Sequence, residues 1–259
     1  TASLQKFSNE ENIENNSRSF SIEVLNEQTK VLLLTSVLHP DIGALKKAIE
    51  TNKQRSVTVE KIRDFKGNIS DYQLIVLYQP VLSFQPIFNK INEEKNNYFI
   101  ITGSATDWSF LNENQSDYYK NRSNQTEEFV AVFNSGFLTF GQEDISFNSF
   151  PPLQDIFGSV QFKTKHDVLL YQNISGIEMK TPLMATFEDD SQKSAVLLGE
   201  GIWKWRAASF VNTNGFNDFD AFISNMIQYL ASTKKRERLN LNYETLYTAN
   251  EPVIVSAFY

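Results

Sequence analysis

Ser104 and His39 are residues of this chain that could together perform nucleophilic catalysis. A serine hydroxyl attacks a carbonyl group only after a base removes its proton, and a carboxylate usually orients that base. Asp41 or Asp107 could supply the carboxylate, because loops at the strand ends of one sheet can meet. The run Thr102-Gly-Ser-Ala105 lacks the second glycine of a nucleophile elbow, and a serine after a strand usually caps a helix. We therefore expect Ser104 and His39 to be helix-capping residues and keep a serine hydrolase as an alternative.

Large aromatic rings and fixed charges lie close together in the string Gly199-Glu-Gly-Ile-Trp-Lys-Trp-Arg206. Exposed tryptophan rings can stack on ligands, which suggests a carbohydrate-binding module as a second alternative. The ligand-binding candidates are Trp108, Glu200, Trp203, Trp205 and Arg206. A purely structural interpretation buries one tryptophan of the string under the following helix, places the other over the sheet edge and stacks or pairs Arg206. For Glu200 we expect an ion pair with Arg206 or Lys204.

The composition argues against several classes of function. The formal net charge of -7 and the sequence pI near 5.0 argue against nucleic-acid binding, which requires clustered cations. The basic run at 234–238 is expected at a helix end, where cations offset the helix dipole. The absence of cysteine removes disulfides, thiolate metal sites and cysteine nucleophiles. We expect no metal and no cofactor.

Several short runs in the first half are apolar throughout, which is typical of strands buried on both faces of a parallel sheet. The predicted strands are residues 31–34, 56–62, 73–78 and 98–102. Helices are predicted after Pro40 and Pro86, because proline is favoured in the first helical turn. This alternation of strands and helices predicts an α/β fold with a doubly wound, mainly parallel sheet.

The second half is predicted to add β-hairpins and further strands. Residues 129–133 and 137–140 flank Asn134-Ser-Gly136, which predicts a hairpin. A long functional or mobile loop is expected at 142–157. An apolar stripe from Phe219 to Leu230 predicts a helix capped by Asn217. Further strands are expected at 167–174, 183–187 and 195–198.

We divide the chain into three parts. Residues 1–19 are polar without periodicity and are expected to be a tail or linker. Residues 20–236 are expected to form one α/β domain that opens with an edge strand at 20–25. Residues 237–259 are expected to supply C-terminal strands at 239–247 and 252–258, as the start of a following β domain. No apolar run approaches the roughly 20 residues that span a bilayer, and we expect no signal peptide before Thr1.

Two parts of the chain resemble the amidotransferase-like domain. The first is residues 31–49, with the run Thr35-Ser-Val-Leu-His-Pro-Asp-Ile-Gly-Ala-Leu45, and the second is the string 199–206 with the helix after it. That domain has the flavodoxin-like fold of class I glutamine amidotransferases and occurs in uncharacterised bacterial cell-envelope proteins. The likeness covers about 20–259, and its most distinctive part is Gly-x-Gly-x-Trp-x-Trp-Arg. It implies a flavodoxin-like fold and a place in the cell envelope, as a periplasmic or extracytoplasmic part of a protein tethered to the membrane through flanking sequence.

The same resemblance argues against the amidotransferase reaction. Members of that class use a cysteine at a tight strand-to-helix turn, with a histidine and a glutamate after a later strand. The corresponding turn here is 102–105, which has no cysteine, and neither His39 nor His166 is near Glu200 in the sequence. Our main expectation is therefore a pseudoenzyme that is not an enzyme itself. It would bind an unknown protein or small molecule, but no nucleic acid, as a module of a larger envelope protein.

Overall fold

The computed structural model describes residues 28–232, apart from 122, 124, 175 and 190, together with four short strands outside that range. These are β1 (Ala2–Ser3) paired with β2 (Ser17–Arg18), and β14 (Asn240–Asn242) paired with β15 (Ser256–Phe258). The chain divides into two units, of which the larger is Gln28–Ser232. The edge strand predicted at 20–25 and most of the predicted C-terminal strands lie outside the described residues.

The larger unit is built on one nine-stranded sheet with the order β4-β3-β5-β6-β13-β12-β11-β8-β9. The first five strands in this order are parallel, and the remaining strands pair antiparallel. The parallel strands are β3 (Thr29–Thr35), β4 (Arg55–Lys61), β5 (Leu74–Tyr78), β6 (Tyr98–Ile101) and β13 (Lys193–Leu197). The antiparallel strands are β8 (Thr126–Phe133), β9 (Leu153–Ile156), β11 (Asp167–Ile174) and β12 (Ile177–Glu188). The expected α/β class is therefore confirmed, with a parallel half and an antiparallel half.

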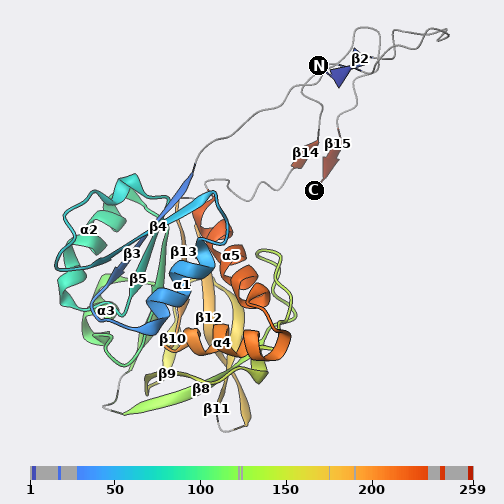
Figure 1. The fold of residues 1–259 in the computed structure, drawn as a ribbon. Coiled ribbons are helices and arrows are strands. Elements are labelled where there is room, and N and C mark those ends of the chain that lie inside the picture. The colour runs from blue at the N-terminus through green and yellow to red at the C-terminus, as the bar shows by residue number, and fades with distance from the viewer. Residues whose placement is uncertain are drawn as a thin grey trace, which may run out of the picture. The chain divides into compact units, whose positions relative to one another are not determined.

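Helices cover both faces of this sheet. They are α1 (Pro40–Ile49), α2 (Gln85–Glu94), α3 (Trp108–Asn114), α4 (Ile202–Thr213) and α5 (Asn217–Ala231). Three short 3₁₀ turns are η2 (Ile69–Asp71), η3 (Leu82–Phe84) and η4 (Phe147–Ser149). Helices α1, α4 and α5 contact one another on one face, and α2 and α3 lie on the other (Figure 1). The crossover after β3 and the crossover after β5 run in opposite directions along the sheet. Because both are right-handed, they place α1 and α2 on opposite faces.

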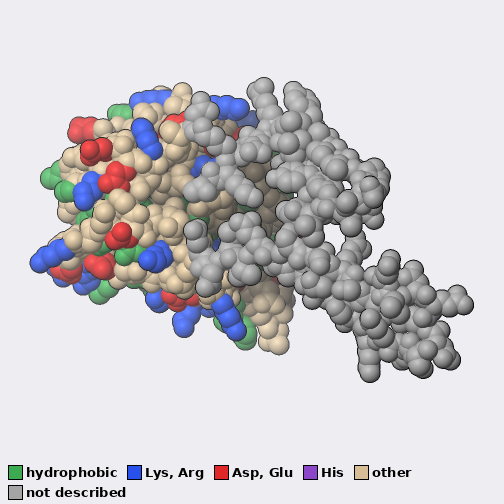
Figure 2. Space-filling model, turned by 90° about the horizontal axis from the view of Figure 1, so that it is seen from above, with side chains coloured by type: hydrophobic (Ala, Val, Ile, Leu, Met, Phe, Trp, Pro, Cys, Tyr) green, Lys and Arg blue, Asp and Glu red, His purple; other side chains and the backbone are tan. Residues whose placement is uncertain are grey.

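The apolar runs form the centre of the core. Val31–Leu34 in β3 and all of β5 are buried, because these strands have helices on both faces. Burying each such side chain contributes about 1.5–3 kcal/mol. On the face of the molecule seen in Figure 2, exposed cations and anions are interspersed. This mixed pattern is typical of a solvated surface.

The predicted hairpin at 129–140 is wrong. Residues 129–133 belong to β8, but residues 137–140 form no strand, and β8 pairs instead with β9 and β11. Phe137 and Phe140 pack edge to face on each other, and Phe140 stacks on Tyr229 of α5. Aromatic packing against the helix therefore replaces strand pairing. The hairpin of the second half is β11 and β12, and the predicted long loop contains η4 and β9. The short strands β7 (Tyr118–Lys120) and β10 (Val160–Phe162) pair separately.

Candidate functional site

The candidate site lies at the carboxyl ends of the parallel strands. Strand β3 has β4 on one side and β5 on its other side. The chain runs from β3 to β4 and then passes back over β3 to reach β5, so the direction of the crossovers reverses and the sheet has a switch point between β3 and β5. Open α/β sheets bind ligands in the crevice at such a point. The segments that follow these strands, 36–39, 79–81 and 102–107, meet at this edge with 198–201 after β13.

His39, Asp41 and Tyr78 form the first polar cluster. The Tyr78 hydroxyl lies 2.7 Å from Nδ1 of His39 and donates to Oδ2 of Asp41 at 2.9 Å. Nδ1 of His39 also lies 3.3 Å from Oδ2 of Asp41 and accepts from the Asp41 amide, so His39 is the N-cap of α1 as predicted. The hydrogen bond to the side-chain carboxylate of Asp41 raises the pKa of His39 above 6.5. Burial raises the pKa of Tyr78 strongly, so its hydroxyl stays protonated.

Asp41 also fixes the beginning of α4. Its Oδ2 accepts from the amide of Gly201 at 2.7 Å, and its Oδ1 accepts from the amide of Trp203 at 2.9 Å. Free amides at a helix N-terminus favour a carboxylate there. Burial acts to raise the pKa of Asp41, but hydrogen bonds from His39 and these two amides hold it below 3.8. One buried carboxylate therefore joins the first turns of α1 and α4.

Ser104, Glu200 and Gln79 form the second polar cluster. The Ser104 hydroxyl donates to Oε1 of Glu200 at 2.7 Å, and Nε2 of Gln79 donates to Oε2 of the same carboxylate. Oε1 of Gln79 accepts from the amide of Ala105 at 2.8 Å, which holds the turn after β6. Glu200 is 9% exposed, whereas Ser104 is exposed. The arrangement presents a serine hydroxyl to solvent with a buried carboxylate behind it.

Gly103 makes room for this second cluster. A Cβ atom at position 103 would lie 2.6 Å from both Nε2 of Gln79 and Oε2 of Glu200. Such a distance is far inside van der Waals contact, so only glycine fits without moving these side chains. The glycine after β6 is thus required by the polar cluster itself.

Gln79 has a left-handed backbone, with φ of 50°, at the end of β5. Non-glycine residues rarely adopt this conformation, and such strain gathers at functional sites. Its carbonyl accepts from the Ser36 hydroxyl at 2.8 Å, and its amide donates to Ile101 at 2.7 Å. The strained strand-to-helix residue of the sheet is therefore Gln79, whereas Ser104 has no positive φ.

The predicted partnership between Ser104 and His39 is not formed. Ser104 uses Glu200, and none of the hydrogen bonds of the described residues joins it to His39. Tyr78 and Gln79 are consecutive residues and connect the two clusters. The other candidate orienter, Asp107, caps α3 by accepting from Ser109 and Phe110, so the cap predicted at Ser104 is also wrong.

The three tryptophans have different environments. Trp108 and Trp205 are fully buried, so the prediction that they are ligand platforms is wrong. Trp205 packs among aromatic rings under α4 and donates to the Pro151 carbonyl at 2.8 Å. Trp203 is 39% exposed in the first turn of α4 and alone among them offers a ring to a ligand. Two residues along a helix turn the side chain to nearly the opposite face, which separates Trp203 from Trp205.

Arg206 is a structural residue. Its guanidinium forms two hydrogen bonds with Asp220, at 2.9 and 3.1 Å, and lies 3.8 Å above the Phe216 ring. This matches the predicted structural interpretation of stacking and pairing. The ion pair that we predicted for Glu200 with Arg206 or Lys204 is absent from the contacts of the described residues, because Ser104 and Gln79 occupy its oxygens.

A buried ion pair supports the turn that carries Ser104. Nζ of Lys120 lies 2.7 Å from Oδ2 of Asp155, and both side chains are at most 1% exposed. The Thr102 hydroxyl donates to the same oxygen at 2.9 Å, and Lys120 lies 4.9 Å above the Trp108 ring. Burial raises the pKa of Asp155, although Lys120 acts against this shift.

Sequence reasoning did not find five residues of this region, namely Tyr78, Gln79, Thr102, Lys120 and Asp155. Tyr78 and Gln79 end a predicted strand, and strand ends at a switch point are the signal that could have found them. Asp155 lies in the predicted loop at 142–157 and Lys120 lies where no element is predicted, and the local sequence carries no sign of their burial. Among the described residues, no group of three or more His, Cys, Asp or Glu side chains is arranged as a metal site. Within the same residues, no helix has the length and apolar character to cross a membrane.

Comparison with known proteins gives structural matches only. No protein-family model matches the chain, and no curated protein matches it in sequence. The carbohydrate deacetylase Agd3 is 8% identical with a TM-score of 0.48, over 79% of this chain and 32% of that chain. An α-L-fucosidase from Paenibacillus thiaminolyticus is 9% identical with a TM-score of 0.47, over 83% of this chain and 34% of that one. The chain thus spans about a third of these enzymes.

A protein from Thermoplasma acidophilum, described as a GMP synthase subunit, is matched over nearly its whole length. It is 6% identical with a TM-score of 0.39, over 78% of this chain and 98% of that chain. We expected a chain that is not an enzyme, and the matches to the carbohydrate deacetylase and the fucosidase correct that expectation. At such low identities and TM-scores they concern the α/β fold and assign no reaction to this chain.

Proposed function

We propose that the carboxyl edge of the parallel strands binds a small, hydroxyl-rich molecule of the carbohydrate class. The observation that carries this proposal is the exposed Ser104 hydroxyl held by the Glu200 carboxylate beside the switch point. Sugar hydroxyls donate and accept hydrogen bonds, and this pair offers an acceptor oxygen and a rotatable hydroxyl. Nε2 of His39 is a further polar atom, since the hydrogen bonds of His39 among the described residues all use Nδ1 or the backbone.

Trp203 supports the same ligand class. Its 39% exposed ring stands in the first turn of α4, three residues after Glu200. Sugar rings have apolar faces that pack on aromatic rings, while their hydroxyls need polar partners at the side. Asp41 fixes the position of this turn through the Trp203 amide. An aromatic platform and a polar rim therefore begin at the same helix end.

The test is a binding screen of mono- and oligosaccharides by saturation-transfer NMR, followed by titration calorimetry with the best ligand. We expect Trp203→Ala to weaken binding by about fivefold or more, because each aromatic contact contributes about 1 kcal/mol or more. The matched control is Phe210→Ala, which removes a 44% exposed ring two turns further along α4. The proposal fails if no carbohydrate binds, or if both variants lose the same affinity.

A second candidate function is hydrolysis of an ester or amide through Ser104. The specific observation in its favour is that Oγ of Ser104 already donates to a carboxylate, which could take the serine proton as general base. The base in this version is Glu200, with His39 and Asp41 adjacent through Tyr78. Labelling by a fluorophosphonate probe and turnover of p-nitrophenyl acetate should both vanish in Ser104→Ala. Equal labelling of the variant would eliminate this candidate.

We also propose that the chain descends from class I amidotransferases and acts in the cell envelope. The strand order β4-β3-β5-β6-β13 and the helix that follows Gly199-Glu-Gly201 support the ancestry. The resemblance to envelope proteins supports the location. Fractionation of cells that express the native protein would test the proposed location, and recovery of the protein in the cytoplasmic fraction alone would overturn that location.

A further inference from the structure

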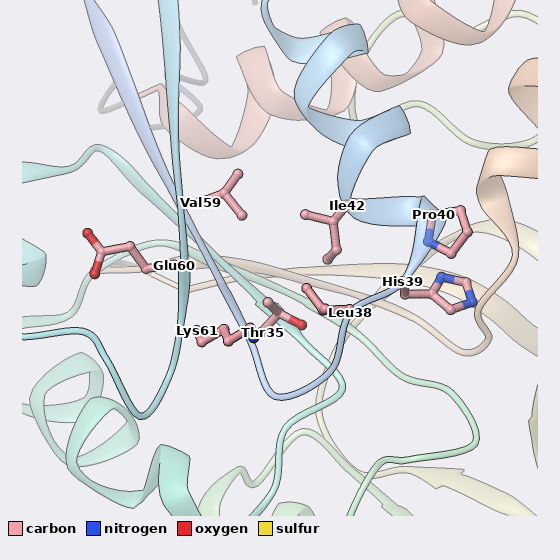
Figure 3. A pocket seen from close by; sticks show the side chains of 8 residues that line it. All are labelled: Thr35, Leu38, His39, Pro40, Ile42, Val59, Glu60 and Lys61. Carbon is pink, nitrogen blue, oxygen red and sulfur yellow. The ribbon is translucent and has the colours of Figure 1, made fainter.

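A hollow of about 460 Å³ lies between the beginning of α1 and the edge strand β4. Its walls are largely apolar and include Leu38, Pro40, Ile42 and Val59. Figure 3 shows the side chains of Ile42 and Val59 facing each other across this space, while Glu60 points away from it. Small-molecule sites have volumes of about 300–1,000 Å³ and mostly apolar walls with a few polar groups.

Lys61 is the cation at this hollow. Alternation along β4 places Arg55, Val57, Val59 and Lys61 on one face, and Arg55 on that face reaches Ser224 of α5. Lys61 therefore lies on the side of the sheet that carries α1 and the hollow. None of the ion pairs of the described residues involves Lys61, whereas Lys46 on α1 pairs with Glu50. The charge of Lys61 is free for a ligand.

A second hollow of about 290 Å³ continues past Lys61 and is more polar. It shares Thr35, Leu38 and Lys61 with the first and adds Ser36, Arg63 and Ser83. Leu38 lines both hollows and is 81% exposed. A molecule that lies across Leu38 would bury it and reach both cations.

We propose that these two hollows bind a small carboxylic acid with an apolar body. The apolar part occupies the space between Ile42 and Val59, and the carboxylate pairs with Lys61 on the side of Arg63. Charge complementarity selects the acid, because Glu60 points away from the first hollow, Lys61 lines both hollows and Arg63 lines the second. The first hollow shares His39 with the proposed carbohydrate site, but neither hollow is lined by Ser104 or Glu200, and the proposal does not depend on the function proposed for that cluster.

The test uses octanoate, the uncharged analogue 1-octanol, and a short peptide that ends in leucine, each titrated into protein with ¹³C-labelled methyl groups. We expect octanoate to shift the methyl signals of Leu38, Ile42 and Val59 in a saturable manner. Lys61→Gln should weaken octanoate binding at least tenfold and leave the weaker binding of octanol unchanged. Lys47→Gln, at an exposed position on α1 outside the hollow, is the charge-matched control and should bind octanoate normally.

Three results would overturn the proposal. The first is an absence of saturable shifts at the three methyl groups with octanoate. The second is an equal loss for octanoate in Lys61→Gln and Lys47→Gln, which would leave no role for the cation. The third is saturable binding of the peptide without binding of octanoate, which would make the hollow a protein-docking surface. The Ser104→Ala variant should bind octanoate like the unmodified protein, so this experiment is independent of the carbohydrate test.

Discussion

Removing the charge of Asp155 should destabilise the domain strongly. In Asp155→Asn the shape of the side chain is kept, and the amide oxygen can still accept from the Ile156 amide in the position of Oδ1. The NH2 group then takes the place of Oδ2, which accepts from Thr102 and Lys120. The variant therefore removes both the charge and the acceptor oxygen opposite Lys120, whose side chain is 1% exposed and whose Nζ lies 2.7 Å from that oxygen. A buried charge that loses its partner costs about 3–5 kcal/mol. For a domain of this size that corresponds to a fall in Tm of about 6–20 °C.

The assay is urea unfolding followed by circular dichroism, with thermal melting as a second measurement. Asp64→Asn is the matched control, because Asp64 is 64% exposed and lies 3.6 Å from Arg63. An exposed pair contributes at most about 1 kcal/mol. The double variant Lys120→Met with Asp155→Asn should recover most of the loss, since no buried charge then remains. A loss below about 1 kcal/mol in Asp155→Asn, or a double variant no more stable than this single one, would refute the reasoning.

Three other predictions concern the candidate site. Gly103→Ala should reduce the free energy of unfolding, because the added Cβ atom would lie 2.6 Å from Nε2 of Gln79. The control is Gly43→Ala in α1, whose Cβ atom would meet nothing within 4 Å and which should stabilise the protein by about 0.5–1 kcal/mol in the same urea assay. The pKa of Asp41 is lowered in the folded state, so the stability that its ionised form contributes is present above pH 3.8 and is lost as the pH falls through the folded pKa. Asp41→Asn should remove this acid-dependent part from a curve of unfolding free energy against pH. An unchanged slope of that curve would contradict the prediction. The pKa of His39 is raised in the folded state, so the stability that its protonated form contributes is present below pH 6.5 and is lost as the pH rises through the folded pKa. His39→Gln should flatten the curve of unfolding free energy against pH between these two pKa values. Curves of identical shape for the variant and the unmodified protein would contradict the prediction.

The parallel half of the fold could be predicted because its signals are local. The runs at 31–34 and 73–78 are apolar on both faces, and Pro40 and Pro86 mark the beginnings of the helices between them. The N-cap role of His39 follows from the same local rules, and the structure confirms it. Local propensity and burial agree at these positions, so the sequence pattern is sufficient.

The rest could not be predicted because it depends on residues that are distant in the sequence. Ser104 meets Glu200 across 96 positions, and Lys120 meets Asp155 across 35. A serine that loses its expected capping role to Asp107 gives no sign of this in its neighbours. The predicted Ser104 and His39 pair failed for the same reason. Both residues reach the same edge, but the side chains between them, Tyr78 and Gln79, decide which groups form hydrogen bonds.

The order in which the strands join the sheet has a consequence for synthesis on the ribosome. Strand β6 ends at residue 101, but its neighbour on the far side, β13, begins only at residue 193. While the intervening segment is still being translated, the first four parallel strands can already pair, and the outer side of β6 remains an open edge of Tyr98-Phe-Ile-Ile101. Such an apolar edge can pair with other chains, so a nascent polypeptide that stalls before residue 193 is expected to require a chaperone.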